Sequence, residues 1–107
     1  MNMSKFINEQ KINKITLFKR IHNFCPMGDD WYTNQLTIEI EPGTYIPDYI
    51  EIEQQLNELE SKSLIVEDVV NKISLILQQY EIKSAHIISE VDDAVHLKVR
   101  VEKVINN

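Results

Sequence analysis

The first half of the chain contains two stretches in which hydrophobic and polar residues alternate. The first predicts a strand over about 14–22, because a two-residue period places its isoleucine and leucine side chains on one face of a sheet. The second predicts a strand over 36–41, which Pro42 and Gly43 end. The segment between them, 23–30, is rich in proline, glycine and aspartate and is predicted to be a loop.

Two helical patterns follow these strands. Hydrophobic residues recur every three or four positions over 48–59 and again over 65–80, with a break at 61–63. Asp48 is predicted to cap the first helix, with Glu51 reaching back to it in a capping box. Isoleucine and glutamate alternate just after the cap, so a short strand extension is the alternative at this point.

Alternation returns near the end of the chain and predicts strands over 85–89 and 95–102, joined by a turn at 90–93. The element order is therefore ββααββ, an α+β layer in which both helices cover one face of an antiparallel four-stranded sheet. Such a sheet has open edges, and assembly of subunits into an oligomeric β-barrel is one way to protect them. Residues 1–13 are predicted to be a tail before a single domain over 14–107.

Composition narrows the possible classes of function. The 107 residues suffice for one domain, and two glycines exclude a Rossmann fingerprint or a P-loop, which need several in one loop. A single cysteine excludes an intramolecular disulfide, and the histidines lack metal-ligand spacing, so no metal site is expected. The net charge of −6 argues against a general nucleic-acid binder. Without a long apolar run or a secretory signal, we expect a cytoplasmic protein that crosses no membrane.

The loop around Cys25 carries residues suited to chemistry. The structural interpretation of Cys25 is a small, buried apolar thiol or an incidental surface thiol. The functional interpretation is a nucleophile, with Asp29 or Asp30 as the neighbouring proton donor. Trp31 and Tyr32 follow in the same loop and either cover part of the core or form a stacking wall for a planar ligand.

Glu67 and Asp68 begin the second predicted helix. Acidic residues favour a helix N-terminus for structural reasons alone, because the backbone N–H groups there carry partial positive charge. The functional interpretation is that the Glu67 carboxylate accepts hydrogen bonds from adjacent N–H donors of a purine-like or pterin-like ring. The sequence pattern by itself leaves both interpretations open.

Together these residues resemble the tunnelling fold, a superfamily with the order ββααββ, and most of all its 7-cyano-7-deazaguanine (nitrile) reductases. FCP at 24–26 is similar to the family's catalytic Cys-Pro, and LTIEI at 36–40 is similar to the strand that follows it. IPD at 46–48 is similar to the family's Ile/Val-Pro-Asp. EDVVNKI at 67–73 is similar to the run that opens a helix in the family.

The resemblance implies a role for each matching residue. Cys25 would attack a nitrile carbon to form a thioimide, and Glu67 would anchor the deazaguanine ring. Asp29 or Asp30 would be the general acid. The ligand would be a planar heterocycle (a deazaguanine, a purine or a pterin) bound between the subunits of a homo-oligomer, in the formation of queuosine-type nucleosides.

The sequence also departs from this family. Val66 stands where the family has a histidine directly before the anchoring glutamate. In the reductases the motif for the nicotinamide cofactor begins the first helix, whereas the similar run ESKSL at 60–64 falls between the predicted helices. This position argues against NADPH use. A short chain without the reductases' cofactor motif resembles the reductase-like amidinotransferases, which add ammonia to a nitrile on tRNA. The net charge of −6 argues against tRNA as a partner of this chain.

Three hypotheses follow from the sequence. The first is a tunnelling-fold enzyme that binds a planar ring through Glu67, in part against Trp31, and uses Cys25 covalently. The second is a non-catalytic relative, a self-assembling binding or interaction module, which the missing histidine and cofactor motif favour. The third is an unrelated α+β protein with the same element order.

Overall fold

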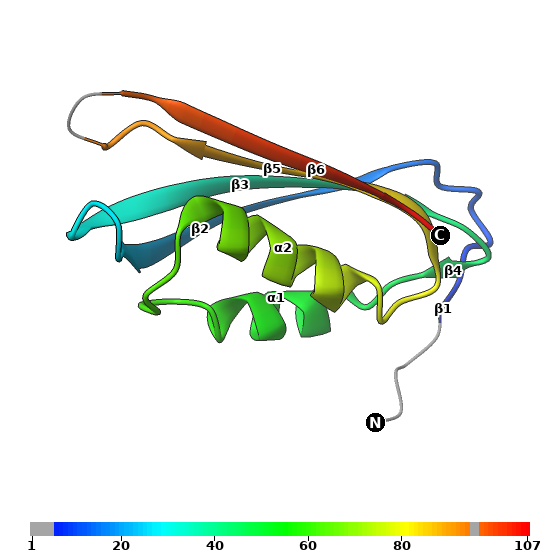
Figure 1. The fold of residues 1–107 in the computed structure, drawn as a ribbon. Helices are drawn as coiled ribbons and strands as arrows, with labels where there is room; N and C mark the ends of the chain where they lie inside the picture. The colour runs from blue at the N-terminus through cyan, green and yellow to red at the C-terminus, as the bar shows by residue number, and fades with distance from the viewer. Residues whose placement is uncertain (1–5, 95–96) are drawn as a thin grey trace.

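The structure is a computed structural model that describes residues 6–94 and 97–107. Its elements are β1 (Phe6–Ile7), β2 (Ile15–Cys25), β3 (Asp30–Pro42), β4 (Tyr45–Ile46), α1 (Tyr49–Asn57), α2 (Val66–Leu77), β5 (Ile82–Val91) and β6 (Val99–Asn106). The four long strands form one antiparallel sheet in the order β2-β3-β5-β6, and both helices lie on one face of it (Figure 1). The predicted α+β order ββααββ is confirmed for this main sheet.

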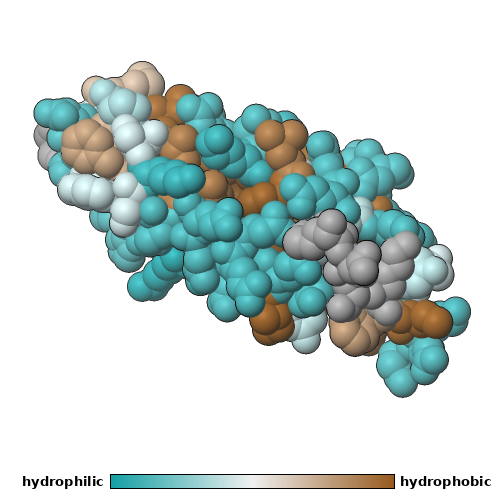
Figure 2. Space-filling model, turned by 90° about the horizontal axis from the view of Figure 1, so that it is seen from below, coloured by the Kyte–Doolittle hydropathy of each residue, from teal (hydrophilic) through white to brown (hydrophobic). Residues whose placement is uncertain are grey.

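The hydrophobic core lies between the helices and the sheet. Every second residue in the middle of β3 is buried, and α2 fully buries Val69 and Ile73 on the face that meets the sheet. Each such side chain contributes roughly 1.5–3 kcal/mol to stability. The helix ends at the buried Leu77, ahead of its predicted end at 80. The opposite side of the helix layer is largely hydrophilic (Figure 2).

Helix α1 begins at Tyr49, so the alternative strand extension is wrong, but the predicted capping box is only half formed. The Asp48 carboxylate accepts the backbone N–H groups of Ile50 at 3.2 Å and Glu51 at 3.1 Å. The Glu51 carboxylate instead accepts the hydroxyl of Tyr80 at 2.9 Å. Because Tyr80 follows α2, this contact ties the two helices together.

Strands β2 and β3 are longer than the sequence predicts, and the loop predicted over 23–30 is reduced to a turn at 26–29. Cys25 pairs with Asp30 at the end of this hairpin. The prediction was wrong because the added strand residues include buried polar ones such as Asn23, which is fully buried. Its amide group is hydrogen-bonded, which offsets the cost of burial, but hydrophobic periodicity does not detect such a position.

The last hairpin is displaced relative to the prediction. β5 ends at Val91 and β6 begins at Val99, whereas the sequence predicted a turn at 90–93 and a strand over 95–102. Of that predicted strand, 95–96 lie outside the described residues. The alternating pattern begins before the segment that pairs with β5, so the pattern alone places the start of the strand too early.

A second, two-stranded sheet holds the N-terminal segment. Strand β1 pairs antiparallel with β4. The side-chain amide of Asn8 donates to the carbonyls of Gly43 at 3.2 Å and Ile12 at 3.0 Å. Residues 6–13, part of the predicted tail over 1–13, therefore contact the segment that joins β3 to β4.

Candidate functional site

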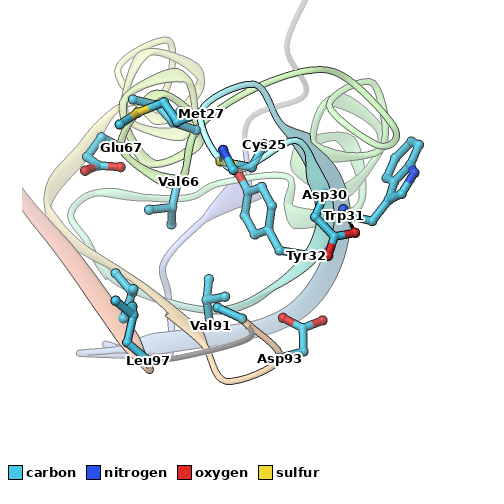
Figure 3. Close-up of a pocket in the computed structure, with 14 residues that line it drawn as sticks. Cys25, Met27, Asp30, Trp31, Tyr32, Val66, Glu67, Val91, Asp93 and Leu97 are labelled. Carbon is cyan, nitrogen blue, oxygen red and sulfur yellow. Dashed lines mark hydrogen bonds between the residues drawn. The ribbon is translucent and has the colours of Figure 1, made fainter.

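A cavity of about 650 Å³ lies at the end of the molecule where the β2–β3 turn, the start of α2 and the β5–β6 connection meet. Most of its lining is apolar, and side chains from these segments point into it from several sides (Figure 3). Three large hydrophobic residues of the described lining are exposed: Met27 is 82% exposed, Leu97 60% and Trp31 56%. The cavity is thus a pocket with an open, hydrophobic rim.

Cys25, the last residue of β2, lines this pocket as a free, half-buried thiol. Its sulfur accepts the backbone N–H of Gly28 at 3.3 Å, and its carbonyl accepts the N–H of Asp29 at 2.8 Å. The β2–β3 turn therefore folds back over Cys25 and fixes the side chain at the pocket wall. The end of a strand in a rigid sheet is a suitable place for a reactive group.

The two aspartates of the turn are placed differently. Asp30 lies opposite Cys25 in the strand register and lines the pocket. One of its carboxylate oxygens accepts the backbone N–H of Trp31 at 2.8 Å. Asp29 has a positive φ of 54° in the turn and does not line the pocket. The geometry brings Asp30, and not Asp29, to the same pocket as the thiol.

Glu67 lies in the first turn of α2 and lines the pocket together with Val66 (Figure 3). The N-cap residue of this helix is Ile65, and no side chain caps it. An acidic residue in the first turn compensates in part for the missing cap, because the free N–H groups there carry partial positive charge. The fold therefore brings Glu67 and Cys25, which are distant in sequence, to one pocket.

Comparison with known proteins gives one result for the sequence and another for the fold. Neither a family model nor a curated protein matches the sequence. The structure, however, is similar to the crystal structure of the archaeosine synthase QueF-Like in the apo form, with a TM-score of 0.76 and 11% sequence identity. The match covers 87% of this chain and 93% of that chain. The chain has the tunnelling fold. The resemblance noted in the sequence is thus confirmed at the level of the fold.

In this tunnelling-fold chain, Trp31 and Tyr32 lie on opposite faces of β3. Trp31 is among the residues that line the pocket, but its ring points away from it (Figure 3). The residue is 56% exposed, and its ring meets the Phe24 ring edge-on at 5.5 Å. Tyr32, which the sequence interpreted together with Trp31 as core cover or a stacking wall, points into the pocket and is only 7% exposed. The sequence predicted a loop for both aromatic residues, whereas the strand period places Tyr32 on the same face of β3 as Asp30.

The run at 60–64, which resembles the cofactor motif of the nitrile reductases, lies between α1 and α2. It runs beside the end of β2: the N–H of Phe24 donates to the Lys62 carbonyl at 3.1 Å, and the N–H of Leu64 donates to the Phe24 carbonyl at 3.0 Å. The Glu60 carboxylate accepts the backbone N–H of His22 at 3.1 Å. This run therefore does not begin a helix.

Asp93 in the β5–β6 connection is a pocket residue that the sequence placed only in a turn and did not identify as functional. Partial burial raises the pKa of its carboxyl group, but hydrogen bonds from Thr33 outweigh burial and bring the pKa below its usual value. Asp30, Glu67 and Asp93 are the charged side chains in the described lining, which contains no lysine or arginine. The electrostatic environment of the pocket is therefore negative.

Within residues 6–94 and 97–107, no three histidine, cysteine, aspartate or glutamate side chains are grouped so that they could hold a metal ion. In the same part of the chain, neither helix has the length and apolar character needed to cross a lipid bilayer.

Proposed function

We propose that this protein binds a 7-deazaguanine or a related purine or pterin ring and that Cys25 forms a thioimide with a nitrile on that ring. One observation carries the proposal: the end of β2 and the first turn of α2 bring Cys25 and Glu67 to one pocket. A ring anchored through its N–H groups by the Glu67 carboxylate would place its substituents toward the opposite wall. The fold it shares with an archaeosine synthase supports this class of ligand.

The chemical step is an addition with no leaving group. The sulfur of Cys25 forms a bond to the nitrile carbon, and one π bond of the nitrile breaks. The nitrile nitrogen takes up a proton, and the thiol loses one. Asp30 lines the same pocket and is the group we assign to this proton transfer. The product, a thioimide, retains every atom of both reactants.

Reduction by NADPH does not fit the residues present. The run that resembles the cofactor motif is hydrogen-bonded along β2, and the described pocket lining offers no lysine or arginine for the cofactor's phosphates. We therefore end the proposed chemistry at the thioimide. A co-reactant such as ammonia could release the product as an amidine and regenerate the thiol.

The proposal is tested by titrating the protein with 7-cyano-7-deazaguanine. We expect a new near-ultraviolet absorption band from the thioimide, which saturates at one ligand per subunit. Guanine lacks the nitrile, so it is expected to compete for the pocket without producing the band. Binding without the band would favour the alternative, a non-catalytic binding module, for which Val66 in the pocket is the supporting observation.

The charge of the pocket leads to a prediction about the form of the ligand. We expect a free base to bind at least about tenfold more tightly than its 5′-monophosphate, since a phosphate adds roughly −1.5 to −2 charge near three carboxylates. Calorimetry with guanine and guanosine monophosphate measures the difference. Guanosine is the control, because it adds the sugar without the charge. Equal affinity for guanine and the monophosphate at low salt would argue against this electrostatic account.

The open edges of the sheet lead to a prediction about assembly. Strands β2 and β6 are the edges of the main sheet, and the pocket beside them has an exposed hydrophobic rim. We propose that subunits join through these edges, as expected for a barrel, and that a neighbouring subunit covers the rim. Native mass spectrometry is expected to show a homo-oligomer. A stable monomer at micromolar concentration would contradict barrel assembly.

A further inference from the structure

The linker between the helices, residues 58–65, is hydrogen-bonded to the sheet more extensively than a surface connection needs. Besides the two bonds of Phe24 described above, the Ser61 N–H donates to the His22 carbonyl at 2.7 Å. The side-chain amide of Asn23 donates to the carbonyls of Leu59 at 2.7 Å and Lys62 at 3.1 Å. The linker is thus held by the same strand that ends in Cys25.

A buried polar chain supports this attachment from across the sheet. The Ser89 hydroxyl in β5 donates to the Asn34 side-chain carbonyl in β3 at 2.8 Å. The Asn34 amide donates to the Asn23 side-chain carbonyl in β2 at 2.9 Å. All three residues are fully buried. A satisfied buried network of this kind has one preferred arrangement, so it fixes the Asn23 amide against the linker.

Tyr32 makes the attachment that lies closest in sequence to Glu67. Its hydroxyl donates to the carbonyl of Leu64 at 2.5 Å, three residues before Glu67 and one residue before the N-cap Ile65. The ring of Tyr32 lies in the pocket, beside Cys25 (Figure 3). Burial raises the pKa of the phenol, so the hydroxyl remains a donor at neutral pH. One side chain therefore both lines the pocket and holds the entry to α2.

The start of α2 depends on such attachments because it lacks a capping side chain. An uncapped helix end has unsatisfied N–H groups and frays readily. Glu67 lies within this first turn, so fraying would move its carboxylate relative to Cys25. We infer that Tyr32 is a positioning residue: its hydroxyl fixes the first turn of α2 and thereby sets Glu67 relative to Cys25 for ligand binding. This inference rests on the proposed function.

The test compares Tyr32→Phe with a matched control, Tyr80→Phe. Both tyrosines are 7% exposed, and both hydroxyls donate to a group in the helix layer, but Tyr80 is not among the residues that line the pocket. We expect Tyr32→Phe to raise the half-saturating concentration of 7-cyano-7-deazaguanine roughly threefold to tenfold. The limiting rate of thioimide formation at saturating ligand is expected to stay close to that of the unmodified protein. Tyr80→Phe is expected to change neither value.

Hydrogen exchange without ligand gives a readout that does not depend on chemistry. Tyr32→Phe is expected to speed exchange of the Leu64, Asp68 and Val69 amides, and Tyr80→Phe is not. The positioning role is overturned if Tyr32→Phe leaves the exchange of these amides unchanged. It is also overturned if Tyr32→Phe and Tyr80→Phe have the same half-saturating concentration of 7-cyano-7-deazaguanine. If the unmodified protein neither binds the ring nor forms the thioimide, the proposed function fails, and the exchange data alone decide whether Tyr32 fixes α2.

Discussion

Replacing Cys25 by alanine is expected to abolish thioimide formation with 7-cyano-7-deazaguanine. Cys25 is the only cysteine of the chain, so no second thiol can substitute for it. The expected result is no near-ultraviolet band and no covalent mass increase, even at ligand concentrations that saturate the unmodified protein. Non-covalent binding of guanine is expected to persist, because the anchor that we propose for the ring is Glu67, which lines the pocket from α2, and not the thiol.

Cys25→Ser is the matched control for folding. In the β2–β3 turn the Gly28 N–H donates to the sulfur of Cys25. A serine hydroxyl can accept the same N–H, so the hairpin should be preserved. A hydroxyl has a far higher pKa than a thiol and is a far weaker nucleophile, so this variant is also expected to form no adduct. An adduct that persisted in Cys25→Ala would contradict the assignment of the nucleophile.

Glu67→Gln is expected to weaken binding of the ring by about tenfold to a hundredfold. Hydrogen bonds to a charged group contribute roughly 1.5–3 kcal/mol, and about 1.4 kcal/mol corresponds to a factor of ten. Glutamine keeps the shape but replaces one acceptor oxygen with a donor, which faces the N–H groups of the ring unfavourably. Isothermal calorimetry with guanine and with 7-cyano-7-deazaguanine, using Cys25→Ala as background, measures the loss without covalent trapping.

Asp68→Asn controls for the helix terminus. Asp68 occupies the same first turn as Glu67 and gives α2 a similar stabilising charge, but it does not line the pocket. Both substitutions remove one negative charge there, so they should lower thermal stability to a similar extent. Only Glu67→Gln is expected to weaken binding of the ring. Equal losses of affinity in both variants would indicate a general effect of the helix terminus and would argue against Glu67 as the anchor.

The parts of the fold that follow hydrophobic periodicity could be predicted from the sequence. The alternation that ends at Pro42 and the helical spacing of Val69 and Ile73 record which side chains face the core. The ends of β2 and β3 could not be predicted this way, because Asn23 and Asn34 are buried polar residues whose partners lie in other elements. Only the three-dimensional arrangement shows that their hydrogen bonds are satisfied.

The site was predictable in part. Cys25 and Glu67 were candidates by their chemistry and position, the resemblance to short family motifs gave each a role, and the fold places both at one pocket. Tyr32 was given the same two interpretations as Trp31, and Asp93 was expected only in a turn. Both lie near segments whose secondary structure was predicted wrongly. Placing Trp31 in a loop concealed the alternation that directs its ring away from the pocket and directs Tyr32 into it.

If Cys25 and the pocket of Glu67 act on the same ligand, incubation with 7-cyano-7-deazaguanine should modify the intact chain. Intact-protein mass spectrometry followed by peptide mapping is expected to show a mass increase equal to one whole ligand, located on the peptide that contains Cys25. Excess guanine, which would compete for the same pocket, is expected to suppress this increase. No mass increase, or an adduct that excess guanine does not suppress, would contradict a common ligand for Cys25 and the Glu67 pocket.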